Sequence, residues 1–395
     1  MNINYIKNPY ISNDPASAKL FGFKQAHAVR QFHKTIPSYQ PTPLYSLKNL
    51  AKELSVKNIY VKDESKRFGL NAFKGLGASY CIGRLIAHKA SLPLEELTWK
   101  KLQEKEVRQA IQDMILVTAT DGNHGRGIAW VASQLDIPAK VFLPKGSSLE
   151  RLEHIQNLGA QAEITSFNYD DTVRLAASME EEKGWTLIQD TAWPGYEILP
   201  LWIMQGYTTM AHEIIEQLQG QRPTHIFLQA GVGSFAGALT GFFTDTYQDT
   251  KPKIVIVEPE GANCLYQSVQ KGTIQNVKEL HTIMAGLSCG QPCTLGWSSL
   301  KNYADFFLSV KDLVTARGMR LLAHPIGQDP QIISGESGAV TTGLAAQLLY
   351  DQDLDTLRQS MELNTSSTIL CISTEGDTDH DSYQKIIENG SNLHP

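Results

Sequence analysis

The chain has 395 residues, of which 42% are hydrophobic and 19% are charged, and its formal net charge is -6. This length suggests two or three structural units, with one large α/β body as the alternative. The acidic balance and the lack of a long basic run argue against nucleic acid or an anionic membrane as the principal partner. We find no apolar stretch of about 18 residues and no apolar core near the N-terminus, so we expect neither a membrane span nor a signal peptide and favour the cytoplasm.

Short, β-branched apolar runs bounded by turn residues recur along the chain and predict strands. These runs are residues 58–64, 114–120, 139–144, 162–167, 186–192, 225–231, 253–259 and 368–374. Helical patterns lie between them, at residues 125–136, 149–159, 207–218 and 236–247, and the charged segment 91–110 is predicted to be a helical insertion on the surface. This alternation predicts an α/β fold with a doubly wound, largely parallel sheet, in which ligands bind beyond the carboxyl ends of the strands.

Lys74 stands immediately before Gly75 and a predicted helix of small residues. A cation at a helix N-terminus is unfavourable for the helix dipole, so this position calls for another explanation. An amine that forms a Schiff base with an aldehyde cofactor is one such explanation. A solvated surface position is the commoner alternative for any single lysine.

The loop of residues 118–125, TATDGNHG, follows the predicted strand 114–120. Its glycines and its asparagine suit a loop that holds a small polar ligand on its backbone. Asp121 has two interpretations. Aspartate is a common helix cap, and a helix is predicted to start near Gly125. Asp121 is otherwise a chemical group of a ligand site, and in this loop we favour that interpretation.

The segment 229–239, QAGVGSFAGAL, joins a predicted strand to a predicted helix in the pattern G-x-G-x-x-x-G. Small residues let a phosphate approach backbone N–H groups, and a helix N-terminus favours its charge. The spacing differs from the dinucleotide fingerprint by one residue, and the Gly-Lys-Ser/Thr ending of a P-loop is absent. A small monophosphate is therefore the predicted ligand, with a tight strand–helix turn as the alternative.

The cysteine count gives little support to a disulfide framework or a metal site. The five cysteines are Cys81, Cys264, Cys289, Cys293 and Cys371. An odd number of cysteines in a long chain that we expect in the cytoplasm argues against a disulfide framework. The four-residue spacing of Cys289 and Cys293 suits half a zinc site, but no second pair completes it, so we predict no metal. A local disulfide from Cys264 to Cys289 or Cys293 stays open beside unpaired thiols.

Three motifs occur in order: Lys74 in the pattern x-F-K-G, the G-N-H-G loop of residues 122–125, and the glycine-rich loop 231–237. Together they resemble the fold type II family of pyridoxal-phosphate-dependent enzymes, which includes serine and threonine dehydratases, threonine synthase and the cysteine synthases. The resemblance covers roughly residues 40–377. It implies two doubly wound α/β domains with mostly parallel sheets and an active site in the cleft between them. Residues 1–77 and 195–395 would form a large cofactor-binding domain, and residues 78–194 a small substrate-loop domain.

The same resemblance implies which residues hold pyridoxal 5'-phosphate. Lys74, beside Phe73, would form the Schiff base, and Asn123 would contact the cofactor's 3-oxygen. The phosphate would lie in the loop formed by Gly231, Val232, Gly233, Ser234, Phe235, Ala236 and Gly237. Ser373 or Thr374 would offer a hydroxyl to the pyridine nitrogen, and the residues do not choose between them. Glu336 resembles a glutamate near that end of the ring in dehydratases, or it caps the helix that follows. A hydroxyl at the ring nitrogen favours β-elimination over transamination.

Two aspartates indicate which members of this family the chain resembles most. In serine and threonine dehydratases the substrate loop resembles S-S-G-N-H, and here Asp121 replaces the second serine. Asp190 ends the run TLIQD and would meet Asp121 across the cleft. Two carboxylates fit a substrate that carries two amines. With TDGNHG, QDTAW, GVGSFAG and ISTEGD, the chain resembles the ammonia-lyases of this family that act on 2,3-diaminopropionate.

That resemblance implies an elimination that converts D- and/or L-2,3-diaminopropionate into pyruvate and two molecules of ammonia. Lys74 would be the base for one isomer and Asp121 the base for the other, a role worth ~10²–10⁴-fold in rate. Asp190 would hold the β-amine or tune Asp121. Thr120, Gly122 and the backbone of the loop would hold the substrate carboxylate, and His124 would orient it or only pack.

Other functions fit part of the same pattern. A serine or threonine dehydratase and a cysteine synthase-like β-replacement enzyme are the enzymatic alternatives. A phosphate-metabolite binding module is the non-enzymatic alternative, and Lys74 argues against it. The partner is therefore expected to be a small amino acid, with no nucleic acid or membrane, and the resemblance implies a homodimer.

Overall fold

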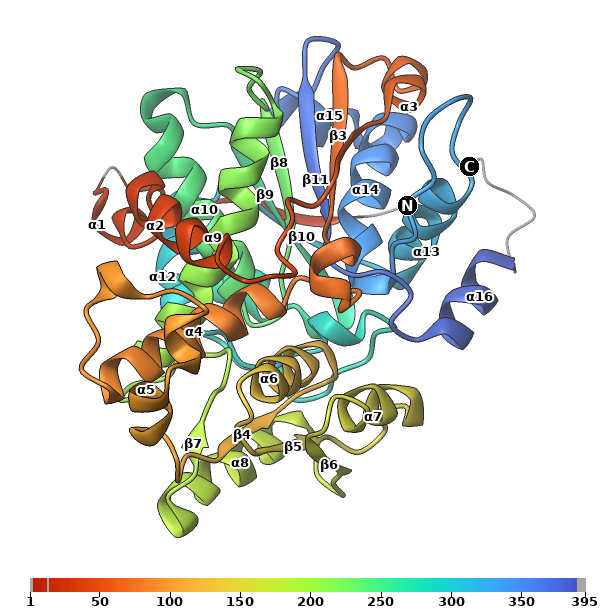
Figure 1. Cartoon of the computed structure of the whole chain (residues 1–395). Helices are drawn as coiled ribbons and strands as arrows, with labels where there is room; N and C mark the ends of the chain where they lie inside the picture. Colours follow the sequence, from red (N-terminus) through yellow and green to blue (C-terminus); the bar gives the residue numbers. More distant parts are fainter. Residues whose placement is uncertain (1–2, 13, 389–395) are drawn as a thin grey trace.

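A seven-stranded sheet forms the centre of the larger part of the molecule in the computed structural model, which describes residues 3–12 and 14–388 (Figure 1). The strand order is β1-β10-β9-β8-β11-β3-β2. The bounds are Asn4–Lys7 (β1), Leu44–Ser46 (β2), Asn58–Asp63 (β3), His225–Gln229 (β8), Lys253–Pro259 (β9), Phe306–Val310 (β10) and Thr368–Ser373 (β11). The five inner strands run parallel, and only the edge strands β1 and β2 pair antiparallel with their neighbours.

A second sheet of four strands lies below the first in Figure 1. Its order is β6-β5-β4-β7, and all its pairs are parallel. The bounds are Leu116–Ala119 (β4), Ala139–Leu143 (β5), Gln161–Ile164 (β6) and Thr186–Leu187 (β7). The predicted fold of two mostly parallel α/β sheets is therefore confirmed. All four strands fall within residues 78–194, although the predicted boundary at residues 77 and 78 lies inside a helix, so the domain bounds stay a prediction.

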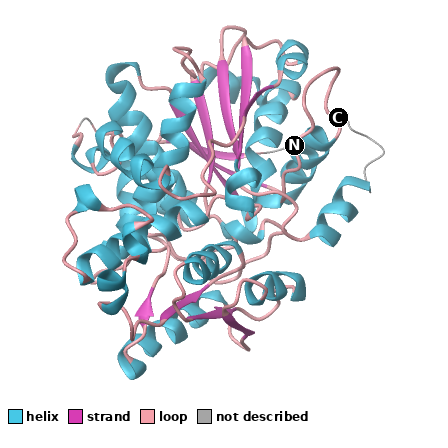
Figure 2. Ribbon diagram, in the orientation of Figure 1, coloured by secondary structure: helices cyan, strands magenta, loops and turns pink. Residues whose placement is uncertain are grey.

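Helices cover both sheets, as the cyan and magenta segments of Figure 2 show. The bounds are Ala16–Lys19 (α1), Phe23–His33 (α2), Lys48–Glu53 (α3), Gly75–Lys89 (α4), Lys105–Gln109 (α5), Asn123–Gln134 (α6), Leu149–Gln156 (α7), Tyr169–Lys183 (α8), Ile198–Gln217 (α9), Ser234–Tyr247 (α10), Cys264–Lys271 (α11), Thr294–Tyr303 (α12), Asp312–Ala323 (α13), Glu336–Tyr350 (α14), Asp355–Ser360 (α15) and His380–Glu388 (α16). None of the described helices is long and apolar enough to cross a membrane.

The large sheet is buried on both faces. Along β9, Ile254 and Ile256 pack into the core that contains residues of α9 and α10, whereas Val255 and Val257 pack into the core that contains residues of α13 and α14. Successive side chains of a strand point to opposite faces, so a strand covered on both sides must be apolar throughout. This requirement explains why the inner strands β3, β8, β9 and β11 could be recognised as continuous apolar runs, whereas the equally buried β10 was not predicted.

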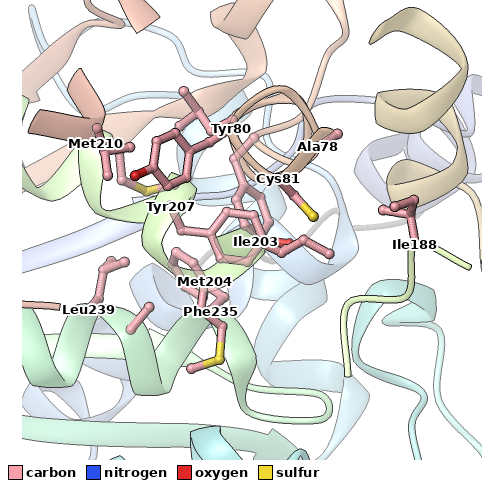
Figure 3. Close-up of a cluster of buried hydrophobic side chains, with 14 of the residues drawn as sticks. Ala78, Tyr80, Cys81, Ile188, Ile203, Met204, Tyr207, Met210, Phe235 and Leu239 are labelled. Atoms are coloured by element: carbon pink, nitrogen blue, oxygen red, sulfur yellow. The ribbon is translucent and has the colours of Figure 1, made fainter. Parts of the chain in front are cut away.

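Helices α4, α9 and α10 meet in one apolar cluster (Figure 3). Close approach of α4 and α9 depends on glycines, because a Cβ on Gly206 would lie 2.5 Å from the carbonyl oxygen of Leu76 and one on Gly77 would lie 2.5 Å from the ring of Tyr207. Lys74 is the N-cap residue of α4. The packing of α4 on α9 therefore fixes where the lysine backbone lies.

One expectation about the chain needs correction, and one question left open by the sequence is decided. Segment 91–110 is not one helix on the surface: it forms two short 3₁₀ turns, Leu94–Glu96 and Lys101–Gln103, followed by the brief α5. Trp99 and Leu102 bury their side chains there, so the segment belongs partly to the core. The structure also shows Cys264, Cys289 and Cys293 as free, buried thiols, as it does the other two cysteines.

Candidate active site

A cavity lies where β4, β7, β8 and β11 end. Its lining comes from both sheets and comprises Phe73, Lys74, Asp121, Asn123, Tyr169, Asp190, Gln229, Ala230, Gly231, Val232, Gly233, Ser234, Phe235, Ala236, Gly286, Leu287, Cys289, Ser337, Thr374 and Glu375. The fold thus brings together most of the sequence-predicted residues. Those it places outside the lining are Thr120, Gly122, His124, Gly237, Glu336 and Ser373.

The glycine-rich loop forms one wall of the cavity between β8 and α10. Gly233 has φ = 93°, a left-handed conformation that favours glycine. A Cβ on Gly231 would lie 3.2 Å from the carbonyl oxygen of Gly286, so a side chain would fill the space along the loop. The first N–H groups of α10 have no partner within the helix, and they suit an anion such as a phosphate. Gly237 has a packing role instead, because its Cβ would lie 2.7 Å from the Cα of Gly296.

Lys74 extends its amine into this cavity, where it forms an ion pair with the carboxylate of Asp190. Burial opposes a charged lysine, but Asp190 outweighs it and the pKa of Lys74 is raised. Burial alone would raise the pKa of Asp190, whereas His124 and Lys74 act in the opposite direction and lower it to about 2. The ammonium of Lys74 also lies 5.4 Å from the ring centroid of Phe73. The pair is therefore ionised at neutral pH.

In the loop after β4, Thr120 holds the backbone and Asp121 faces the cavity. Thr120 Oγ1 accepts hydrogen bonds from the backbone N–H groups of Gly122, at 2.9 Å, and Gly125, at 3.0 Å. Helix α6 has Gly122 as its N-cap and no side-chain cap. The interpretation of Asp121 as the helix cap is therefore wrong, because Thr120 holds the loop and Asp121 lines the cavity.

Asp121 has a carboxylate that is free to interact with a ligand. Among the described residues it accepts no hydrogen bond, whereas Asp190 is paired with Lys74 and Glu375 accepts from two donors. Burial raises the pKa of Asp121, against the opposing effect of Arg151 and Lys74. The side chain is thus the cavity carboxylate best suited to take up a proton.

His124 lies behind Asp190 and does not line the cavity. Its Nε2 is 2.8 Å from the carbonyl oxygen of Ile188, and its Nδ1 is 3.8 Å from Asp190 Oδ2. Burial lowers the pKa of His124. The geometry suits an orienting contact to Asp190 better than a contact to a substrate.

Glu375 is a residue that the sequence reasoning missed. Its Oε1 accepts from the backbone N–H of Ser337 at 3.0 Å, and its Oε2 accepts from Nδ2 of Asn123. Glu336, which was expected near the cofactor, instead accepts a 2.6 Å hydrogen bond from Ser382 Oγ and does not line the cavity. The motif ISTEGD contains Glu375, so the signal was its position directly after a predicted strand end.

Of the neighbouring residues Ser373 and Thr374, only Thr374 lines the cavity. Ser373 Oγ is buried and donates to Ser334 Oγ at 2.7 Å, whereas Thr374 lines the cavity. Of the two residues left open by the sequence, only Thr374 is placed to meet a ligand there. Among the described residues, no group of three or more His, Cys, Asp or Glu side chains is suited to a metal ion.

The cavity combines an amine, an anion-binding glycine loop and a hydroxyl, which are the groups that pyridoxal phosphate requires. A family model described as pyridoxal-phosphate dependent enzyme matches residues 36–372. Diaminopropionate ammonia-lyase from Salmonella typhimurium is 48% identical over 382 residues, covering 95% of each chain. The enzyme of that name from Escherichia coli K12 is 48% identical over 394 residues, covering 99% of this chain and 97% of the other. The chain therefore belongs to the pyridoxal-phosphate-dependent enzymes, and within them to the diaminopropionate ammonia-lyase family.

Solved structures agree with this placement. The structure of the Escherichia coli diaminopropionate ammonia-lyase in complex with an aminoacrylate-PLP azomethine reaction intermediate has a TM-score of 0.92 and 47% identity, and covers 99% of this chain and 98% of its own. A threonine deaminase from Solanum lycopersicum has a TM-score of 0.74 at 20% identity, covering 98% of each chain. The second similarity shows the shared fold alone.

Proposed function

We propose that this chain uses pyridoxal 5'-phosphate to eliminate ammonia from 2,3-diaminopropionate, and that hydrolysis of the released product by one water gives pyruvate and a second ammonia. The observation that carries the proposal is the free carboxylate of Asp121 inside the cavity, beside Lys74 and the paired Asp190. Dehydratases have a hydroxyl in the corresponding loop position. A carboxylate there suits a substrate with a second amine, and the family relatives carry the same activity in their names.

The residues that would hold the cofactor surround the cavity. Lys74 would bind its aldehyde carbon, and residues 231–236 would hold its phosphate on backbone N–H groups. Asn123 and Thr374 would contact polar atoms of the ring, the latter at the nitrogen. When bound, the cofactor supplies an electron sink that makes the substrate's α-proton acidic.

Two side chains are placed to remove that proton. Lys74 would serve one configuration of the α-carbon and Asp121 the other. A general base works best when its pKa is near the operating pH, and burial moves the pKa of Asp121 upwards from its ordinary value. The amide of Asn or the hydroxyl of Ser at this position would provide no such base.

Asp190 would bind the ammonium side of the substrate. Its carboxylate is ionised, buried and already holds an ammonium, that of Lys74. A substrate amine of the same charge and size would replace that contact when Lys74 is engaged elsewhere. Tyr169, whose hydroxyl accepts from Gln189 Nε2 at 3.2 Å, lines the same cavity. The backbone of the Thr120 loop would hold the substrate carboxylate.

A pyruvate assay on D- and L-2,3-diaminopropionate, serine and threonine tests the proposal. We expect the highest kcat/KM on a diaminopropionate isomer. A preference for serine or threonine would replace the proposal with a dehydratase. We further propose a cytoplasmic homodimer with domains at residues 1–77 plus 195–395 and 78–194. Light scattering should then give twice the chain mass of 43.8 kDa.

A further inference from the structure

Gln229 is the last residue of β8 and lies directly before the glycine-rich loop. It is 2% exposed and lines the cavity. Its Nε2 is 2.9 Å from the carbonyl oxygens of Ser337 and Ile372, and 3.0 Å from Thr374 Oγ1. The two carbonyl oxygens can only accept, so they fix which end of the amide is the nitrogen.

This arrangement restricts the hydroxyl of Thr374. An amide nitrogen carries hydrogens and offers no acceptor, so Thr374 cannot donate to Gln229. Among the described residues, Thr374 Oγ1 has no other hydrogen-bond partner. Because Thr374 lines the cavity, its hydroxyl hydrogen is left to point at a ligand there. Ser373 differs, since its hydroxyl donates to Ser334 and is already engaged.

The other end of the amide gives a second, independent observation. Gln229 Oε1 is buried and has no hydrogen-bond partner among the described residues. A buried oxygen without a donor destabilises a fold, and an apolar side chain of similar volume would avoid that cost. An amide at this position is therefore explained by what its nitrogen does: it is held by the carbonyl oxygens of Ser337 and Ile372 and, so oriented, meets Thr374 Oγ1.

We propose that Gln229 is a positioning residue that keeps the Thr374 hydroxyl as a hydrogen-bond donor toward the cofactor's ring nitrogen. The ring nitrogen of the cofactor would then accept the hydrogen bond from Thr374, which requires that the nitrogen is unprotonated. This inference rests on the proposed placement of the cofactor in this cavity and does not depend on which amino acid the enzyme converts. It assigns the control of the ring's protonation to a buried residue of the cavity wall that reaches the ring through Thr374.

Cofactor affinity tests the inference without any activity measurement. The apo-protein is titrated with pyridoxal phosphate and with its 1-deaza analogue, in which the ring nitrogen is replaced by C–H, and binding is followed by absorbance. The wild-type protein should bind the analogue roughly five- to tenfold more weakly, the usual worth of one hydrogen bond. In Thr374→Val and in Gln229→Met, the ratio of the two dissociation constants should fall to within about twofold of unity.

Ser373→Ala is the matched control, because it removes a neighbouring buried hydroxyl that does not line the cavity, and it should keep the wild-type ratio. If Gln229→Met does not fold, Gln229→Glu takes its place and should also lower the ratio. An unchanged ratio in a folded Gln229 variant, or a wild-type ratio of one, overturns the inference. Failure of the wild-type protein to bind pyridoxal phosphate at all would instead overturn the proposed function.

Discussion

Replacing Asp121 with asparagine tests the division of labour between the two bases. The change keeps the shape of the side chain and removes its ability to take up a proton. The loop should stay in place, because Thr120 Oγ1 accepts two of its backbone N–H groups and Arg151 contacts the backbone carbonyl of Asp121, 3.3 Å away, rather than the carboxylate. The effect should therefore be confined to chemistry.

The size of the effect follows from what remains in the cavity. Asp190 would be occupied by the ammonium of Lys74 or of the substrate, and Glu375 is held by Asn123 and a backbone N–H, so we expect neither carboxylate to replace Asp121. Loss of a general base typically costs ~10²–10⁴-fold in rate, or about 3–5 kcal/mol of barrier. We expect that loss in kcat/KM for the isomer that Asp121 serves, and a loss below about tenfold for the isomer that Lys74 serves; if Asp121 is the base for the D-isomer, D-activity falls far more than L-activity.

Initial rates of pyruvate formation on the two separate isomers measure this difference. Asp170→Asn is the matched control: its carboxyl pKa is also raised by burial, but it lines a separate hollow and not the cavity. That variant should keep the D-to-L ratio of the wild type. Equal losses on both isomers in Asp121→Asn would refute the assignment of the two bases.

Two further predictions concern pH and stability. Because the folded-state pKa of Asp190 is lowered to about 2, its carboxylate stabilises the apo-protein above the ordinary aspartate pKa of about 3.9, and this contribution is lost as pH falls toward 2. The difference in urea midpoint between the apo-forms of wild type and Asp190→Asn should therefore shrink between pH 4 and pH 2, and a constant difference would contradict the ion pair. Glu258 behaves oppositely: burial raises its pKa to about 8, against hydrogen bonds from the N–H groups of Leu265 and Tyr266, so it destabilises the fold increasingly as pH rises from the ordinary glutamate pKa of about 4.3 to 8. Glu258→Gln should gain stability relative to wild type over that range in denaturant titrations, and no gain at pH 9 compared with pH 5 would show that the carboxylate is ionised at no cost.

Burial explains most of the strands that the sequence predicted, although the buried inner strand β10 was missed. The inner strands β3, β8, β9 and β11 are covered on both faces and appear as apolar runs. Edge strands β1 and β2 are short and partly exposed, so they carry no such pattern and were not predicted. Segment 91–110 has helix-forming residues, but its buried Trp99 docks the chain in short turns, a tertiary effect that local propensity does not contain.

The residues of the candidate site also fall into those that the sequence predicted and those that it did not. Asp190 and the glycine-rich loop 231–237 each follow a strand. They could be predicted as site residues, because the carboxyl ends of parallel strands lie at one edge of a sheet, where ligands bind. Gln229 and Glu375 also stand at predicted strand ends, but their partners could not be predicted, because the contacts join residues far apart in sequence: Gln229 contacts Thr374 and Ser337, and Glu375 contacts Asn123. A single sequence contains no signal for such pairings.

Asp121 shows how the contacts of its neighbour decide between the two interpretations that the sequence offered for it, helix cap and group of a ligand site. Thr and Asp are both good helix caps, and they are neighbours here, so composition favours neither. In the structure, Thr120 Oγ1 accepts the hydrogen bonds from the N–H groups of Gly122 and Gly125. A capping aspartate would be held as a fixed, ionised acceptor with a lowered pKa. Released from that role and buried in the cavity, Asp121 has a raised pKa and an open carboxylate, the two properties that a base for an α-proton needs.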